Sequence, residues 1–129
     1  MRPIPVGAKG RSEIVVGPEH LASTVKSAIL PPVLATPIMI LLMENAALEA
    51  VRPYLEASES CVGTHVDVAH LAATPEGRRV IAEARVTGVD GRRISFAVTA
   101  RDEREEIGRG RHERVVIDMA AFSERLKKK

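Results

Sequence analysis

Residues 34–52 have the sequence LATPIMILLMENAALEAVR, and this stretch predicts one long helix. Pro37 suits the first helical turn, where its missing N–H would have no partner, and Pro53 ends the run. The residues between them are mostly good helix formers and include no further Pro and no Gly. Thr36 has the hydroxyl that helix N-caps favour, so we expect the helix to start there.

The helix carries a carboxylate, Glu44, on its apolar side. At ~100° per residue, the neighbours of Glu44 are apolar: Ile40, Leu41, Leu48 and Val51. An ionised carboxylate is costly there unless it is paired or hydrogen-bonded, or unless its pKa rises until it is neutral. Two interpretations follow. Glu44 either pairs with a buried base or backbone donor, or it has a functional role.

Length and composition predict one globular domain over residues 1–129, large enough to hold a hydrophobic core. No apolar run is long enough to span a bilayer, so we expect no membrane insertion. The formal charge of +2 depends on Lys127–Lys129, because without them 16 basic residues face 17 acidic ones, a net charge of −1. With only three aromatic residues for base stacking, nucleic-acid binding is not expected.

The single cysteine, Cys61, excludes an internal disulfide framework, and the N-terminus lacks the apolar core of a signal peptide. Both features predict a cytoplasmic protein. His65 and Asp67 alternate like a pair of metal ligands, but a closed zinc site needs further ligands, so we expect no metal. No Gly-rich phosphate loop and no Gly-x-Ser-x-Gly elbow occurs, and we expect no cofactor.

The order of the predicted elements indicates an α+β fold. Residues 1–12 are rich in Pro, Gly and basic groups and are expected to lie loosely on the surface. After them we predict a strand over 13–16, a short helix or lid over 19–33, the central helix, strands over 60–71, 80–86, 94–100 and 113–118, and a helix over 120–129. One antiparallel sheet would wrap around the apolar helix. Its open edges favour a homodimer with strands paired edge to edge.

The strand over 60–71 alternates, with Val62, Thr64, Val66, Val68 and His70 on one parity. We therefore expect His70 to point inward with the valines, and His65 and Asp67 to point outward. Thr36, Glu44 and His70 then supply a candidate nucleophile, base and orienter. Thr36 as a simple N-cap and His70 as a hydrogen-bonded core histidine stay open as alternatives. Because Thr36 and Glu44 are about 12 Å apart along one helix, a site shared between two chains would bring the three residues together.

The spacing of these residues resembles the hot-dog-fold thioesterases, and most closely the fluoroacetyl-CoA thioesterase family. The resemblance runs from about residue 15 to 126 and depends on three motifs: LATP (34–37), Met-Glu (43–44) and VGTHVDVAH (62–70) followed by AATPEG (72–77). It implies an acyl-CoA substrate, a hot-dog dimer with active sites at the subunit interface, and Thr36, Glu44 and His70 as catalytic residues. It also implies that Gly63 and Arg114 contact the substrate.

The chain departs from the fluoroacetate-specific pattern at its lid. That pattern has a phenylalanine-rich lid over the acyl pocket, whereas residues 17–35 here contain no aromatic residue, and we expect Leu30 near the gate. The resemblance therefore implies hydrolysis of a short-chain acyl-CoA of broader identity. Two alternatives stay open, a non-catalytic acyl-CoA-binding module and a hot-dog dehydratase.

Overall fold

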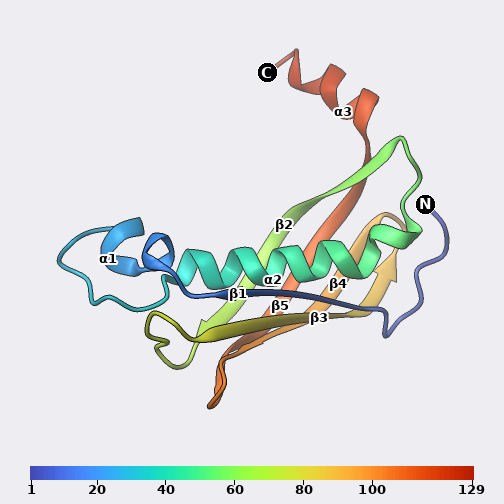
Figure 1. The fold of residues 1–129 in the computed structure, drawn as a ribbon. Coiled ribbons are helices and arrows are strands. Elements are labelled where there is room, and N and C mark those ends of the chain that lie inside the picture. Colours follow the sequence, from blue (N-terminus) through green and yellow to red (C-terminus); the bar gives the residue numbers. More distant parts are fainter.

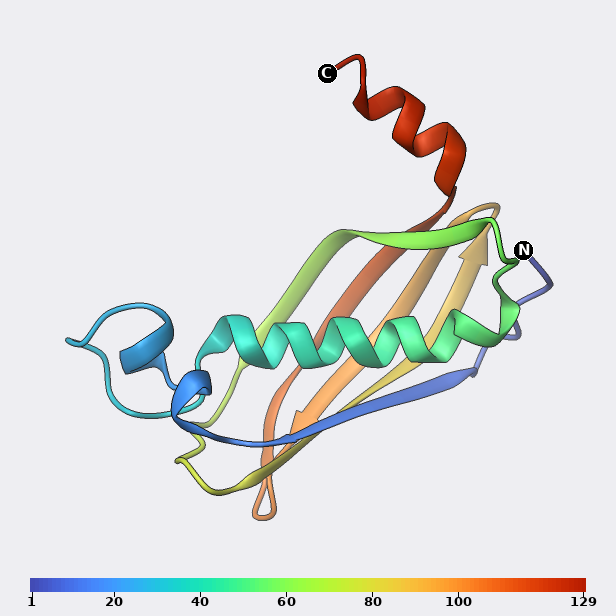
Figure 2. The same ribbon diagram turned by 45° about the horizontal axis from the view of Figure 1, so that its top comes forward.

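A computed structural model describes residues 1–129, and its central helix, α2 (Thr36–Val51), lies inside the curl of a five-stranded antiparallel sheet (Figures 1 and 2). The strands follow the order β1-β3-β4-β5-β2. They are β1 (Lys9–Val15), β2 (Glu59–His70), β3 (Arg79–Asp90), β4 (Arg93–Arg101) and β5 (Glu106–Asp118). Shorter elements are η1 (Pro18–His20), α1 (Ala22–Val25), η2 (Arg52–Tyr54) and α3 (Met119–Leu126). The predicted α+β arrangement is confirmed.

Helix α2 packs on the sheet through a stripe of buried side chains, Met39, Leu42, Met43, Ala46, Ala47 and Ala50. The alanines let strand β1 cross the helix closely. A Cβ atom built on Gly10 of β1 would overlap the carbonyl oxygen of Ala46 and the backbone nitrogen of Ala50. Only glycine fits at this crossing, which fixes how far β1 stands from the helix.

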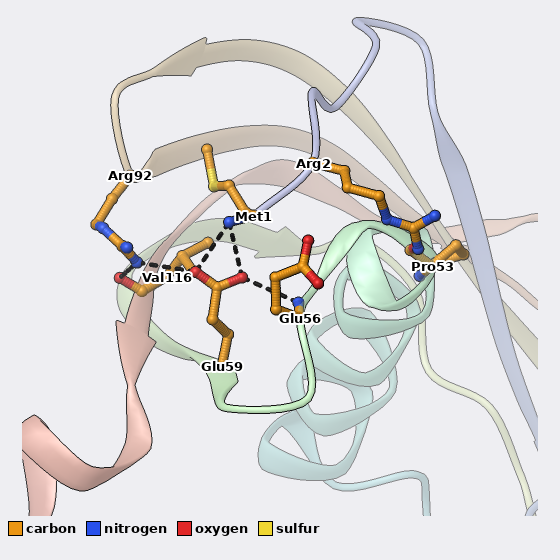
Figure 3. A network of polar contacts seen from close by, with 7 residues as sticks. All are labelled: Met1, Arg2, Pro53, Glu56, Glu59, Arg92 and Val116. Atoms are coloured by element: carbon orange, nitrogen blue, oxygen red, sulfur yellow. Dashed lines mark hydrogen bonds and ion pairs between the residues drawn. The ribbon is translucent and has the colours of Figure 1, made fainter.

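The N-terminal residues differ from the prediction, because residues 1–12 do not lie loosely on the surface. Strand β1 begins at Lys9, Ile4 is buried, and the N-terminal ammonium of Met1 lies 2.9 Å from Glu59. Glu59 also accepts a hydrogen bond from the Arg92 guanidinium, as Figure 3 shows. Arg2, drawn in the same view, donates a hydrogen bond to the carbonyl of Pro53. The backbone N–H of Glu56, followed by the N-terminal ammonium, lowers the pKa of Glu59. These contacts hold the N-terminus against the end of α2.

Strand β5 is longer than predicted, since it begins at Glu106 and not at residue 113, and it includes Gly108 and Gly110. Both glycines lie where the chain leaves no room for a side chain. A Cβ on Gly108 would stand 2.5 Å from the Met39 sulfur, and one on Gly110 would overlap the carbonyl of Asp67. The glycines therefore mark close contacts inside a strand and not its end.

Strand β2 contains a β-bulge that changes which residues face the helix. Gly63 pairs with Arg114 and His65 pairs with Glu113, which leaves Thr64 as the extra residue. An extra residue moves the following side chains to the other face, so Cys61 and Gly63 face inward before the bulge and even-numbered residues do so after it. The predicted inward position of Val62 is wrong for this reason, whereas that of His70 is right.

Strand β2 is also an edge of the sheet, and the bulge is exposed. Val66 is 41% exposed on this strand, and Leu41 is 47% exposed on the adjoining flank of α2. Helix α3, whose N-cap is Asp118, extends away from the body of the molecule (Figure 1). None of the helices combines the length and the apolar character needed to cross a lipid bilayer.

We predict that Gly10→Ala destabilises the protein by about 1–3 kcal/mol, because the added methyl overlaps the backbone of α2 and forces β1 away from the core. Urea denaturation measures the change. Gly88→Ala on β3 is the matched control, since no atom lies within 4 Å of its Cβ position. Equal stabilities for the two variants would contradict the close crossing.

Candidate functional site

Thr36 is the first residue of α2, but its hydroxyl does not cap the helix. The N-cap position belongs to Ala35, which makes no side-chain hydrogen bond to the helix. The Thr36 Oγ1 atom instead lies 2.8 Å from Nδ1 of His70. The N-cap prediction is therefore wrong, and the hydroxyl is available to the histidine.

His70 is the last residue of β2, where the strand passes the start of α2. Burial of the ring lowers the pKa of His70, which favours the neutral imidazole near pH 7. A neutral imidazole has one nitrogen that accepts a proton and one that carries it. The second nitrogen, Nε2, is buried and makes no hydrogen bond of normal geometry, although the backbone of Ala72 lies near enough to favour the protonated ring. A buried unpaired nitrogen is costly, which is typical of a functional position.

Thr36 and His70 open into a pocket of about 400 Å³. Its lining is mostly apolar and comes from α1, the segment before α2 and the segment after β2: Ala22, Lys26, Leu30, Val33, Leu34, Leu71, Ala72 and Ala73. Leu30 thus lies where the sequence placed it, in the wall of the pocket that contains the hydroxyl and the imidazole. A concave apolar cavity with a few convergent polar groups is the usual form of a small-molecule site.

A second polar cluster surrounds Gly63, farther along α2. A Cβ atom on Gly63 would lie 3.0 Å from Oε2 of Glu44 and 3.5 Å from Nη1 of Arg114. The Glu44 carboxylate is 37% exposed and lies 3.9 Å from the buried Arg114 guanidinium. The pairing alternative for Glu44 is thus partly realised, as an ion pair too long for a hydrogen bond. Glu44 belongs to the flank of the helix and not to its core.

Two further residues belong to this cluster, His112 and Cys61, and the sequence alone did not point to either as a site residue. His112 is 1% exposed, and its Nε2 atom lies 3.3 Å from Nη1 of Arg114. The Sγ atom and the carbonyl oxygen of Cys61 accept hydrogen bonds from Arg114 at 3.1 and 2.9 Å. His112 shares the parity of Arg114 and Val116 on β5, and this alternation was the signal available in the sequence.

The structure therefore contains two separate clusters. One joins Thr36, His70 and Leu30, and the other joins Glu44, Gly63 and Arg114. Eight residues of helix, about 12 Å, separate Thr36 from Glu44. Within one chain the three predicted catalytic residues do not form a single constellation.

Comparison with known proteins identifies the family of the chain. The profile of the fluoroacetyl-CoA-specific thioesterase family matches residues 16–120. The chain belongs to this family. The fluoroacetyl-CoA thioesterase of Streptantibioticus cattleyicolor is 41% identical, over 96% of this chain and 93% of its own length.

Several solved thioesterase structures superpose closely on the chain. The structure of the fluoroacetyl-CoA thioesterase FlK is 39% identical, with 98% of each chain covered and a TM-score of 0.92. A variant of FlK solved with acetyl-CoA is 39% identical, covers 96% and 97% of the two chains and has a TM-score of 0.90. A thioesterase superfamily member from Thermus thermophilus is 36% identical, covers 99% and 96% and has a TM-score of 0.89. The predicted hot-dog fold is confirmed.

We predict that the free energy of unfolding of this thioesterase family member falls as the pH is lowered from 7 to 5. Burial lowers the pKa of His70 and of His112 below the value of about 6.5 that each has in the unfolded chain. Between pH 6.5 and the lower folded-state pKa values, the unfolded state binds more protons than the folded state. The contribution of the two histidines to the free energy of unfolding is therefore fully present above pH 6.5, and it is lost as the pH falls through this window. Urea titrations at pH 7, 6 and 5 measure the slope, and a level or rising stability would contradict it.

Proposed function

We propose that this acyl-CoA thioesterase hydrolyses short-chain acyl-CoA to the free acid and CoA, with Thr36, Glu44 and His70 as its catalytic residues. The observation that carries the proposal is the 2.8 Å contact between the Thr36 hydroxyl and the His70 imidazole in an apolar pocket. A hydroxyl is a weak nucleophile until a neighbouring base takes its proton. A neutral His70 with its lone pair on Nδ1 is such a base.

Glu44 and Gly63 would complete the reaction at the thioester carbonyl. The Glu44 carboxylate is close enough to Gly63, on the inner face of β2, to orient or activate a nucleophile there. Arg114 is too far away to form a hydrogen bond with this carboxylate, so its oxygens stay available. Backbone N–H groups at the Gly63 bulge are our candidates for stabilising the oxyanion. Arg114 and Gly63 then serve as substrate contacts, as the family resemblance implies. The scheme uses side chains and CoA, which is part of the substrate, and needs no cofactor and no metal.

We propose that a homodimer joins the two clusters. Strand β2 is an edge strand, and an antiparallel pairing with the same strand of a second copy would satisfy its open side. If the twofold axis crosses β2 near Val66 or Asp67, His70 lies beside the bulge of the other chain, next to the partner's Gly63. The Thr36–His70 pair of one chain would then face the partner's Glu44. The exposed Leu41 and Val66 would be covered by the same contact.

The shape of the pocket supports a short acyl chain. The pocket has a volume of about 400 Å³. The acyl group and the pantetheine end of CoA would both have to fit into this volume, which leaves little space for a long acyl group. A variant of FlK was solved in complex with acetyl-CoA, whose acyl group is short. The side chain of Leu30 in the pocket wall is aliphatic, whereas the fluoroacetate-specific pattern has phenylalanines in its lid. We therefore expect the pocket to accept several short acyl groups. A cytoplasmic location stays a prediction.

The test is a panel of acyl-CoAs with a thiol reagent for released CoA, beside an absorbance assay for enoyl formation. We expect His70→Ala and Glu44→Gln to lower kcat by roughly 10²–10⁴-fold, because general acid–base groups contribute on that scale. Glu83→Gln, at an exposed position, is the control for Glu44→Gln. The rate should also fall in acid, as the pH drops through the lowered pKa of His70 and its ring becomes protonated.

Three results would decide against parts of this proposal. Full activity in His70→Ala or Glu44→Gln would remove the catalytic assignment. Stoichiometric binding without release of CoA would favour the binding module. Formation of an enoyl product would favour the dehydratase.

The dimer predicts cross-linking at the twofold axis. Directly opposed residues in an antiparallel pair have Cβ atoms close enough for a disulfide. We therefore expect either Val66→Cys or Asp67→Cys to give a covalent dimer on mild oxidation, measured on a non-reducing gel. Arg11→Cys, on the edge strand β1 at the other side of the sheet, is the control. Absence of cross-linking in both β2 variants, with a monomer by light scattering, would contradict the dimer.

A further inference from the structure

His112 is fixed in the floor of the Glu44 cluster by packing. It lies on the inner face of β5, is 1% exposed, and stacks on Phe96 with ring centroids 5.8 Å apart and planes inclined by 25°. Stacked rings in a close-packed interior do not rotate freely. The two ring nitrogens therefore have fixed directions.

The chemistry of the neighbours assigns a proton to each ring nitrogen. Nδ1 of His112 lies 2.8 Å from the carbonyl oxygen of His65, which can only accept, so Nδ1 carries the hydrogen. Burial lowers the pKa of His112, so the ring is neutral near pH 7 and Nε2 keeps its lone pair. Arg114 has only donors, and its Nη1 atom is 3.3 Å from Nε2. The imidazole thus donates to the bulged strand and accepts from the guanidinium.

Arg114 is held at three points by acceptors other than Glu44. Nε and Nη2 donate to Cys61, and Nη1 donates to His112. Only the long 3.9 Å contact joins Nη1 to the Glu44 carboxylate. An arginine free to move would be expected to close on a carboxylate and form a bidentate pair, which lowers the basicity of the carboxylate.

We propose that His112 is a positioning residue that holds the Arg114 guanidinium beside Gly63 and prevents it from closing on Glu44. The charged and titratable groups that face the His112 ring are Glu44 from α2, Arg114 from β5 and His65 from β2. The His112 ring accepts the hydrogen bond that fixes Nη1 of Arg114, and Nη1 is the guanidinium nitrogen nearest to Glu44. The inference depends on the proposed hydrolase function for its kinetic readout, but not for its geometry.

Two substitutions separate positioning from a purely structural role. In His112→Gln the side-chain oxygen can reach the position of Nε2 and accept from Arg114, whereas in His112→Asn the amide nitrogen can reach the position of Nδ1 and donate to the His65 carbonyl. A positioning role predicts that the Gln variant keeps most of kcat, while the Asn variant loses roughly 10-fold or more, the effect of one hydrogen bond to a charged group. A structural role predicts the reverse order in both stability and rate.

The double variant supplies the second readout. We expect His112→Asn to lower kcat in the unsubstituted background but to have almost no effect beside Arg114→Ala, since the residue acts through the guanidinium. Equal losses in the two backgrounds, or an Asn variant as active as Gln, would overturn the proposal.

A spectroscopic measurement keeps the geometry testable without turnover. The ¹⁵N spectrum of the unsubstituted protein should show His112 as a neutral ring protonated at Nδ1. The Nε2 protonated tautomer would overturn the proposal. If the Nδ1-protonated tautomer is found but the acyl-CoA panel releases no CoA, the proposed function has failed and the placement of Arg114 has not.

Discussion

The apolar helix α2 has a single sheet to cover it, and this constraint determines where the polar groups lie. Five strands enclose the stripe of Met39, Leu42, Met43 and the alanines, but β2 forms an edge and leaves one flank of the helix partly open. Leu41 is 47% exposed on that flank, and Glu44 follows one turn later. A carboxylate is tolerated there because the flank is neither core nor fully solvated surface. The open flank is therefore both the weak point of the packing and the place available for chemistry.

Strand β2 links the two polar clusters through its bulge. Before Thr64 the strand turns Gly63 toward Glu44 and Arg114, and after Thr64 it turns the valines and His70 toward the start of the helix. Without the extra residue, a strand of uniform alternation would direct either Gly63 or His70 away from α2. The imidazole of His112 donates to the carbonyl of His65 just after the bulge, which joins the irregular part of β2 to β5. The positions of both clusters thus depend on the β-bulge in the pairing of β2 with β5.

The two clusters also differ in how their charges are controlled. His70 has a lowered pKa because its ring is buried, and its partner is a neutral hydroxyl. Glu44 faces a guanidinium that is held by other acceptors and stays 3.9 Å away. A neutral base at one end of the site and a carboxylate with a restrained counter-ion at the other are suited to proton transfer near neutral pH. The proposed dimer would join them by pairing an edge strand that is already open.

The sequence by itself determined the elements and the identity of the main polar residues. The helix over residues 36–51 and the inward position of His70 follow from local propensity and alternation, which depend on near neighbours. Only the tertiary structure decided that Thr36 bonds His70 and does not cap the helix, that Gly108 and Gly110 lie within β5, and that β2 changes parity at Thr64. It also decided that His112 and Cys61 hold Arg114. These features depend on which strand or helix stands opposite, and a close contact or a bulge is a property of two segments that no single stretch of sequence specifies.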